Sequence, residues 1–201
     1  MADYHFFATV SRMKYITRWA LMRNSRCENL SEHSLEVAMI AHALCLIGNT
    51  KYGKNLDADR AAVLAMYHDA SEIITGDLPT PVKYYNKDIK TAYKEVERIA
   101  EGQLLDELPE YLRSSYEGIV KETDDPKDAE LRKYVKAADK LSALIKCVEE
   151  ERSGNTEFKT AYQSTMESIR AIGEELPEVN DFTEDFLSAY GNTLDELLRK
   201  G

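Results

Sequence analysis

Residues 61–72 of this chain read AAVLAMYHDASE, an apolar helical run that ends in the adjacent pair His68-Asp69. Burying two polar groups at the end of an apolar helix is unfavourable unless something binds them. Imidazole nitrogen and carboxylate oxygen together suit divalent cations such as Mn, Fe, Co, Ni or Zn. The stretch therefore offers two candidate metal ligands at the end of a buried helix, although a His-Asp pair alone also occurs by chance.

Two further residues could complete such a site, His33 upstream and Asp139 downstream, each on its own expected helix. Asp139 follows two alanines, whose small side chains let neighbouring helices approach closely. A carboxylate on a partly apolar helix face should be paired or bound to a metal. Two histidines and two aspartates would fill four positions of an octahedron and leave two for water or substrate, which indicates a catalytic site.

Each of these residues also has an ordinary structural interpretation. A lone histidine on a helix is more often hydrogen-bonded than metal-bound, and a lone aspartate is usually solvated or paired. The remaining histidines do not enlarge the set. His42 follows His33 by about two and a half helical turns and should face the opposite side, and His5 is expected to pack. We therefore expect a single metal ion.

The composition excludes several classes of protein. The 201 residues are 43% hydrophobic and 31% charged, which suits one globular domain with a buried core. With 26 basic and 36 acidic residues the net charge is −10, so the chain is not expected to coat nucleic acid. No apolar run reaches the roughly 18 residues of a membrane span. The first residues lack the basic start and apolar stretch of a signal peptide.

The cysteines and the basic residues add two expectations. Cys27, Cys45 and Cys147 have no CxxC spacing, which indicates reduced thiols in a cytoplasmic protein. Five basic residues fall within fifteen positions that contain no acid: Arg12, Lys14, Arg18, Arg23 and Arg26. Two interpretations of this segment stay open, a solvated helix face or a local surface that captures phosphate.

Apolar spacing predicts helices almost throughout and no strand of convincing length. Caps and breakers divide the chain into expected helices over residues 4–16, 31–48, 57–74, 88–106, 110–120, 126–152, 156–176 and 181–200. Ser31, Asp57 and Asp125 are the expected N-caps. Residues 75–81 (TGDLPTP) contain a glycine and two prolines and should form a loop directly after the candidate ligands. We expect one all-α domain over residues 1–201, a helical bundle with a mononuclear metal site in its core.

Two acidic residues lie just beyond the candidate ligands. Glu72 follows His68 by four residues and Asp69 by three, so a continuous helix would place all three on one face. A carboxylate beside a metal site is well placed as a general base or acid, whereas the alternative is an exposed glutamate near a helix end. Asp77 could accept a sugar hydroxyl or assist proton transfer, or it could simply form the turn.

The pattern of His33, His68-Asp69 and Asp139 on an all-helical chain resembles the HD-domain metal-dependent phosphohydrolases. Four surrounding segments resemble the bacterial 5′-deoxynucleotidase branch of that family: residues 18–24 (RWALMRN), 28–34 (ENLSEHS), 67–72 (YHDASE) and 75–83 (TGDLPTPVK). The resemblance is dense over residues 1–105 and continues through the helix of Asp139. It is loose over residues 121–130 and from about residue 155 onward.

This resemblance implies an HD-domain bundle that hydrolyses deoxyribonucleoside 5′-monophosphates to deoxyribonucleoside and phosphate and selects against ribonucleotides. It implies one divalent cation (Mn, Co, Fe, Zn, Ni or Mg) and a homodimer. By the resemblance, the metal is held by His33, His68, Asp69 and Asp139. The implied catalytic residues are Glu72, which transfers a proton, Asp77, and Arg18, which orients the phosphate. The residues implied to contact the substrate are Arg18, Trp19, His33, Asp69, Asp77, Leu78, Pro79 and Thr80.

Trp19 is implied to pack where a ribose 2′-hydroxyl would lie. A bulky indole can reject one extra hydroxyl by leaving it no space and no partner, although an apolar wall alone discriminates modestly. The alternative is a core residue that closes the first helix. A planar guanidinium at Arg18 suits a pair of phosphate oxygens.

Three other functions stay open. The first is an HD phosphohydrolase that acts on a nucleoside triphosphate or a cyclic nucleotide. The second is a non-catalytic nucleotide sensor that keeps the metal for structure alone. The third is a plain helical interaction protein, which would make the four ligand-like residues and the basic segment coincidental. Release of phosphate from a nucleotide would separate these functions.

Overall fold

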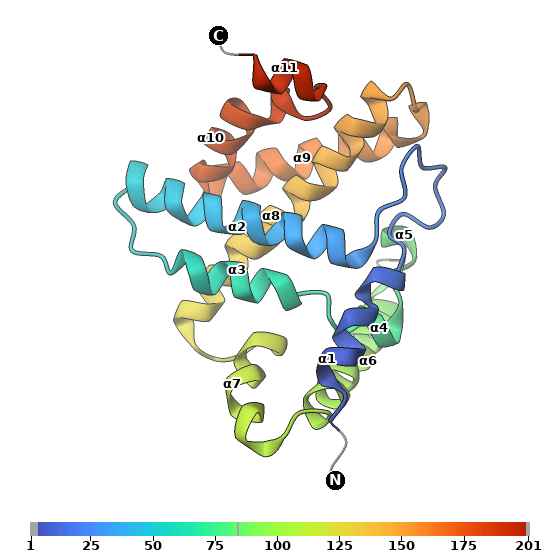
Figure 1. Cartoon of the computed structure of the whole chain (residues 1–201), viewed down its shortest axis with the longest axis vertical. Helices are drawn as coiled ribbons and strands as arrows, with labels where there is room; N and C mark the ends of the chain where they lie inside the picture. The colour runs from blue at the N-terminus through green and yellow to red at the C-terminus, as the bar shows by residue number, and fades with distance from the viewer. Residues whose placement is uncertain (1–3, 84, 200–201) are drawn as a thin grey trace.

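Helix α2 (Leu30–Lys51) runs through the centre of the structure, a computed structural model that describes residues 4–83 and 85–199 apart from the side chain of Thr80 (Figure 1). Asn29 caps this helix, because its side chain accepts hydrogen bonds from the amides of Ser31 and Glu32. Glu32 accepts from the Asn29 amide in return, which completes a capping box. The predicted cap at Ser31 was therefore wrong by two residues.

The core forms where α2 meets two other helices, α3 (Ala58–Tyr67) and α8 (Pro126–Arg152). In Figure 1, α3 runs beside α2 and α8 passes behind it. Many of the contacting side chains are small, which lets the helix axes approach closely: Ala38, Ala41, Ala61, Ala65, Ala137 and Ala138. Leu44, Leu64 and Leu141 fill the remaining space and are fully buried. These contacts fix the start of α2, the end of α3 and the middle of α8 close to one another.

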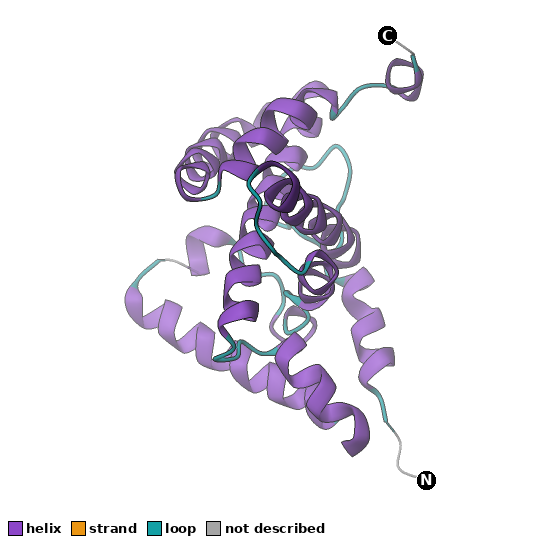
Figure 2. Cartoon of the chain, turned by 90° about the vertical axis from the view of Figure 1, so that its left-hand side faces the viewer, coloured by secondary structure: helices purple, strands orange, loops and turns teal. Residues whose placement is uncertain are grey.

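The other elements surround this centre. They are α1 (Phe6–Val10), η1 (Ser11–Tyr15), α4 (Glu72–Thr75), α5 (Thr80–Lys83), α6 (Lys87–Asp106), α7 (Glu110–Val120), η2 (Thr156–Phe158), α9 (Lys159–Glu175), α10 (Pro177–Phe186), η3 (Leu187–Ala189) and α11 (Leu194–Leu198). Figure 2 shows helices and loops, and strand-like pairing in the described residues is limited to one bridge between Thr17 and Asn29. The all-α prediction is therefore confirmed.

Several predicted boundaries differ from the structure. The caps at Asp57 and Asp125 are confirmed, since both side chains accept first-turn amides. The helix expected over residues 57–74 ends at Tyr67 and resumes as α4 after a turn. The loop expected over residues 75–81 is shorter, because Pro81 lies in the first turn of α5, where its missing amide is tolerated. The helix expected over residues 181–200 is wrong, since α10 already begins at Pro177 and ends at Phe186.

Helix α2 is long and apolar enough to cross a membrane by length and composition alone. Half of the apolar stretch is buried within the structure, however. A central core helix meets the same criteria. The contacts of α2 with α3 and α8 account for its apolar composition.

Candidate metal centre and active site

The structure brings together the four residues predicted as metal ligands. His33 lies in the first turn of α2, His68 and Asp69 follow α3, and Asp139 lies midway along α8. Nitrogen or oxygen atoms of His33, His68 and Asp139 all lie within 4.8 Å of one another. Oδ2 of Asp69 lies 3.2 Å from Nε2 of His68 and 3.6 Å from Nε2 of His33. We call these four residues the metal centre.

The hydrogen bond of His68 leaves one ring nitrogen available to a cation. Its Nδ1 lies 2.6 Å from the carbonyl oxygen of Ala65, which can only accept, so Nδ1 carries the proton. Nε2 is then the unprotonated nitrogen, and it is buried without a hydrogen-bond partner among the described residues. A ligating histidine usually shows this arrangement, in which a backbone carbonyl fixes the tautomer.

A side-chain hydroxyl, rather than a backbone carbonyl, fixes the tautomer of His33. Ser142 donates its hydroxyl proton to Oε2 of Glu36 at 2.6 Å, so its oxygen can accept the Nδ1 proton of His33 at 3.1 Å. Nε2 of His33 is buried, has no hydrogen-bond partner in the described part of the chain, and faces Asp139 Oδ1 at 3.3 Å. Two orphaned imidazole nitrogens beside two carboxylates fit a divalent cation.

The carboxylates of the metal centre are held ionised. Burial alone would raise the pKa of Asp139, but the His33 imidazole beside it and the charge of Lys140 hold that pKa well below its usual range. Burial likewise opposes ionisation of Asp69, yet the adjacent His68 imidazole lowers the pKa of Asp69 to about 2. The centre therefore presents negative charge at neutral pH.

A break in the helix lets two neighbouring residues face one point. Successive side chains on a regular α-helix point about 100° apart. His68 and Asp69 lie beyond the last residue of α3, where amides 68, 70 and 72 bond to carbonyls three residues back. Their side chains converge because they leave the end of the helix. The expectation that Glu72 shares a continuous helix face with them was wrong, because Glu72 begins α4.

Arg18 lies against the metal centre. Its Nη1 is 3.5 Å from Asp69 Oδ2, and its Nη2 is 4.0 Å from Asp139 Oδ1. Burial opposes the charged form, but the carboxylates of Asp69, Asp139 and Glu28 raise the pKa of Arg18. The guanidinium therefore stays charged and can hold two oxygens of an anion that reaches the centre.

Trp19 follows in a strained backbone conformation. Its φ angle is +56°, and it is the one non-glycine residue of the described chain with a positive φ. The indole Nε1 donates to Oε2 of Glu28 at 3.0 Å, and the ring centroid lies 5.3 Å from that of Phe158. The side chain of Asn24 donates to the Trp19 carbonyl at 3.2 Å. Surrounding contacts therefore over-determine this residue.

The loop that carries Arg18 and Trp19 is tied to α8 by a buried ion pair. Glu150, which is 2% exposed, accepts the amides of Ser25 and Arg26 at 2.8 and 3.4 Å and the Asn155 side chain at 2.7 Å. Lys146 pairs with Glu150 and donates to the Arg26 carbonyl at 2.5 Å. Burial opposes the ionised form, but these bonds lower the pKa of Glu150 to about 2. The loop is thereby held on the core.

Glu72 and Asp77 lie near the metal centre but differ from its ligands. Glu72 is 6% exposed, and its Oε2 has no hydrogen-bond partner among the described residues. Burial and the charges of Asp69 and Asp77 raise the pKa of Glu72 to about 9, so its carboxyl holds a proton at neutral pH. Burial also raises the pKa of Asp77, although the charge of Arg18 opposes this shift. Glu72 is therefore a candidate proton donor beside the metal centre.

A cleft of about 730 Å³ opens from the metal centre. This volume lies in the range of small-molecule sites. Arg18, Trp19 and Asp139 line one part of it, and Asp77 with Pro79 lines another. Helix α9 contributes a wall of hydroxyl and small side chains: Thr160, Ala161, Ser164, Thr165 and Ser168. The divergent C-terminal part of the chain thus forms one side of the cleft.

Other predicted site residues fall in several places. Leu78 is half-buried and is not among the described residues that line the cleft. The side chain of Thr80 lies outside the described residues. His42 lies away from the metal centre and pairs with Asp59 at 3.5 Å, as expected from its spacing. His5 is exposed, so the expectation that it packs was wrong.

The basic segment divides into two parts. Arg18 lines the cleft, whereas the other four side chains, those of Arg12, Lys14, Arg23 and Arg26, are exposed. Arg23 pairs with Glu157 at 2.9 Å and Arg26 with Glu32 at 3.4 Å. The interpretation as a solvated surface therefore applies to these four residues.

Sequence comparison agrees with this arrangement. The family described as 5′-deoxynucleotidase YfbR-like matches residues 5–190. The chain belongs to the YfbR-like 5′-deoxynucleotidase family. It is 49% identical to the 5′-deoxynucleotidase YfbR of Escherichia coli K12 over 203 aligned positions, which span 98% of this chain and 97% of that relative. The metal centre and Arg18 all lie within the part of the chain that the family covers.

Solved structures share the fold. An HD-domain phosphohydrolase from Listeria innocua superposes with a TM-score of 0.78 at 24% identity, over 98% of this chain and 90% of that one. The HD phosphohydrolase DatZ of cyanophage S-2L, described as bound to dA and one catalytic Zn2+ ion, gives a TM-score of 0.63 at 19% identity, over 90% of this chain and 93% of that one. The fold of the YfbR-like chain is therefore that of the HD phosphohydrolases.

Sequence reasoning missed the residues that support the site. Ser142 follows Asp139 by three residues and so shares its helix face, but neither this spacing nor that of Glu36 indicates a role. Glu28 lay within a segment of family resemblance, yet nothing in its spacing pointed to Trp19 or His33. A weak signal existed for Glu150, because it follows Lys146 by four residues, a spacing that permits an ion pair along a helix.

Proposed function

We propose that this protein hydrolyses deoxyribonucleoside 5′-monophosphates to a deoxyribonucleoside and phosphate, with one divalent cation held by the metal centre. The observation that carries the proposal is the meeting of two orphaned imidazole nitrogens, two ionised carboxylates and a charged guanidinium at the end of one cleft. A cation and an arginine together suit a phosphate group.

The relatives support the class of substrate. The Escherichia coli protein that is 49% identical over nearly the full chain is named a 5′-deoxynucleotidase. The cyanophage phosphohydrolase of the same fold is described as bound to dA and one catalytic Zn2+ ion. Both support a deoxyribonucleoside compound as the ligand of the cleft, and the cyanophage protein also supports a divalent cation beside it. Mn, Co, Fe, Zn, Ni and Mg all remain candidates for that cation, because mixed nitrogen and oxygen ligands suit several metals.

A phosphate in this site would be oriented by Arg18. When bound, a divalent cation supplies charge neutralisation of the phosphate and a stronger water nucleophile. The guanidinium, which lies between Asp69 and Asp139 and within 4.0 Å of each, would take the remaining phosphate oxygens in a bidentate contact. Attack in line with the leaving 5′-oxygen is the geometry expected for phosphoryl transfer.

Glu72 would supply the proton that the leaving 5′-oxygen needs. Burial and the charges of Asp69 and Asp77 raise the pKa of its carboxyl, which favours the protonated form that a general acid needs. A general acid at this place contributes about 10²- to 10⁴-fold to rate. Asp77 is the alternative donor, and its position in the cleft also suits a hydrogen bond to a sugar hydroxyl.

Trp19 and the α9 wall would hold the nucleoside. The indole would occupy the space that a 2′-hydroxyl requires, which selects against ribonucleotides. The hydroxyls of Ser164 and Ser168 donate to the backbone carbonyls of Ala161 and Ser164, so on this wall they would offer acceptor oxygens to a base. We also place Leu78, Pro79 and Thr80 in contact with the substrate, and His33 and Asp69 beside its phosphate.

We further propose a homodimer in the cytoplasm that binds neither nucleic acid nor membrane. The family resemblance implies the dimer. Free thiols at Cys27, Cys45 and Cys147 fit a reducing compartment. Sedimentation equilibrium would test the dimer directly, and a monomer at micromolar concentration would refute it.

The deciding experiment measures phosphate release from dAMP and AMP side by side, with Mn, Co, Mg, Zn and without metal. Metal-dependent release from dAMP and little from AMP is the expected result. Equal rates would keep the phosphomonoesterase but remove the 2′-hydroxyl filter. No release from either nucleotide, with metal bound, would refute the proposal in favour of a triphosphate or cyclic nucleotide substrate or a nucleotide sensor.

A further inference from the structure

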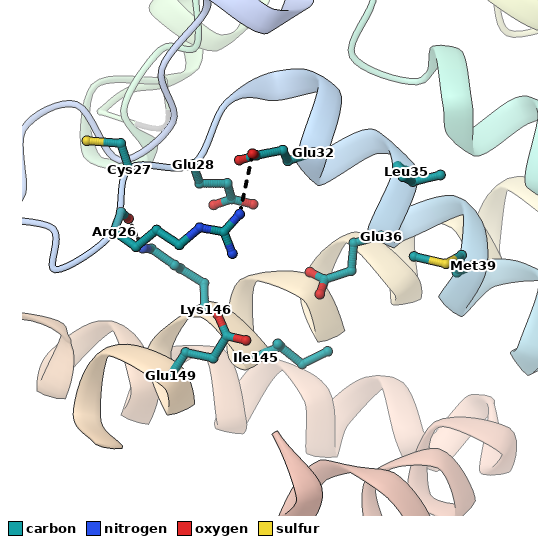
Figure 3. A pocket seen from close by; sticks show the side chains of 10 residues that line it. All are labelled: Arg26, Cys27, Glu28, Glu32, Leu35, Glu36, Met39, Ile145, Lys146 and Glu149. Carbon is teal, nitrogen blue, oxygen red and sulfur yellow. Dashed lines mark hydrogen bonds and ion pairs between the residues drawn. The ribbon is translucent and has the colours of Figure 1, made fainter. Parts of the chain in front are cut away.

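Glu28 contacts three parts of the active site with one carboxylate. Its side chain is 14% exposed and lies beside the first turn of α2, behind Arg26 in Figure 3. Oε2 accepts the indole Nε1–H of Trp19 at 3.0 Å. Oε1 lies 3.5 Å from Nδ1 of His33 and 3.8 Å from Nε of Arg18. Glu28 therefore joins the proposed ribose filter, the phosphate-binding arginine and a proposed metal ligand.

Trp19 needs such a contact to act as a filter. Its φ of +56° is unfavourable for a bulky side chain, and such backbones persist only where neighbours hold them. Phe158 contacts the indole at a ring distance of 5.3 Å, an apolar contact that leaves the ring free to slide. The bond to Glu28 is directional, so it fixes the orientation of the ring.

We propose that Glu28 is a positioning residue that fixes the indole of Trp19 at the 2′ position of the sugar and thereby sets the preference for deoxyribonucleotides. This inference rests on the proposed function. Glu28 lines a groove of about 250 Å³ on the other side of the loop and is not among the described residues that line the substrate cleft. It acts through Trp19, because an apolar wall rejects a hydroxyl only while the wall stays in place.

Three substitutions separate the contacts of Glu28. Glu28→Ala removes all of them. In Glu28→Gln, the amide oxygen can still accept from the indole of Trp19. The amide NH₂ group would then face N–H donors of Arg18 and His33, which is unfavourable. Trp19→Phe keeps an aromatic ring but lacks the indole N–H. Glu149→Gln is the matched control, since it changes a carboxylate that lines the same groove.

The fluorescence of Trp19 tests the contact without any substrate. Trp19 is the single tryptophan of the chain, so emission reports this residue alone. We expect Glu28→Ala and Glu28→Gln to increase acrylamide quenching of the indole and to lower its anisotropy. Glu149→Gln should match the wild type. Unchanged quenching and anisotropy in a folded Glu28→Ala protein would overturn the proposal.

Selectivity tests the consequence. The measured quantity is the ratio of kcat/KM for dAMP to kcat/KM for AMP. Loss of one hydrogen bond predicts a fall in this ratio of about 3- to 10-fold in Glu28→Ala, Glu28→Gln and Trp19→Phe. The double variant Glu28→Ala/Trp19→Phe should fall no further than the larger single effect, because both changes remove the same bond.

The outcomes are distinguishable from a failure of the proposed function. A Trp19→Phe protein that keeps the full dAMP preference would overturn the role of the hydrogen bond, even if Glu28→Ala does not fold. Additive losses in the double variant would overturn it as well. A wild type that releases no phosphate from dAMP would instead refute the proposed function, and the quenching data would still decide the Glu28–Trp19 contact.

Discussion

Replacing Ser142 with alanine tests whether His33 offers its Nε2 atom to a metal. Ser142 is fully buried, donates to Glu36 Oε2 at 2.6 Å and lies 3.1 Å from His33 Nδ1. The hydroxyl therefore fixes the tautomer of His33. Alanine removes this acceptor. Oε1 of Glu28, at 3.5 Å, then remains as an acceptor for the Nδ1 proton of His33.

The size of the effect follows from these distances. Removing a partner that orients a ligating histidine weakens metal affinity by about 10- to 100-fold, or about 1.4 to 2.8 kcal/mol. Because Glu28 can still accept from Nδ1 at a longer distance, we expect a loss near the lower end, about 10-fold. Folding stability should fall by about 1 to 3 kcal/mol, since Glu36 loses its donor as well.

Calorimetric titration with Mn or Zn measures the affinity, and kcat at saturating metal shows whether the chemistry survives once the cation is bound. Ser34→Ala is the matched control. Ser34 is 4% exposed, neighbours His33, and has a hydroxyl without a hydrogen-bond partner among the described residues. A Ser142→Ala affinity within about twofold of the Ser34→Ala value would refute the argument that Ser142 fixes the tautomer of His33.

Four further predictions concern proton transfer and the loop anchor. Glu72→Gln should lower kcat by about 10²- to 10⁴-fold and leave metal affinity unchanged; a near-normal rate would transfer the role to Asp77. If the protonated form of Glu72 is active, kcat should fall as pH rises through the pKa of Glu72, which is about 9 and is lowered when a bound cation offsets the charge of Asp69; a rate that climbs through this range would contradict the assignment. Glu150→Ala should destabilise the fold by about 3 to 5 kcal/mol in urea unfolding, because Lys146 is left buried and unpaired, with exposed Glu151→Ala as control. The pKa of Glu150 falls from 4.5 unfolded to about 2 folded, so its stabilisation should be full above pH 4.5 and lost as pH falls through 2; Glu150→Gln should flatten this dependence.

The sequence allowed the helices and the candidate metal ligands to be located because both depend on local signals. Apolar periodicity and side-chain caps are short-range features, so α3 and α8 began where expected. The candidate ligands were recognisable as a set, because two histidines and two aspartates on apolar helices together suit a metal, although each alone usually has a structural role. The meeting of His33 with Asp139 then followed from helix packing.

The remaining features depend on contacts between distant segments. No glycine or proline follows Tyr67, so the sequence gives no signal for the break in the helix. The bond from His68 Nδ1 to the Ala65 carbonyl forms only once the turn has folded. The link from Glu28 to His33 crosses a helix cap, and that from Ser142 to Glu36 joins two helices. Spacing within one helix carries no information about either.

The four candidate ligands lie on separate segments of the chain, so a bound cation would also affect folding stability. They come from α2, from the turn after α3 and from α8, which are the helices that form the core. A cation held between them would act as a cross-link that closes two long stretches of chain. At a free concentration of about 100 times its dissociation constant, it would add about 2.7 kcal/mol to folding stability. Cellular metal supply would then govern the lifetime of this protein against proteases as well as its turnover of substrate.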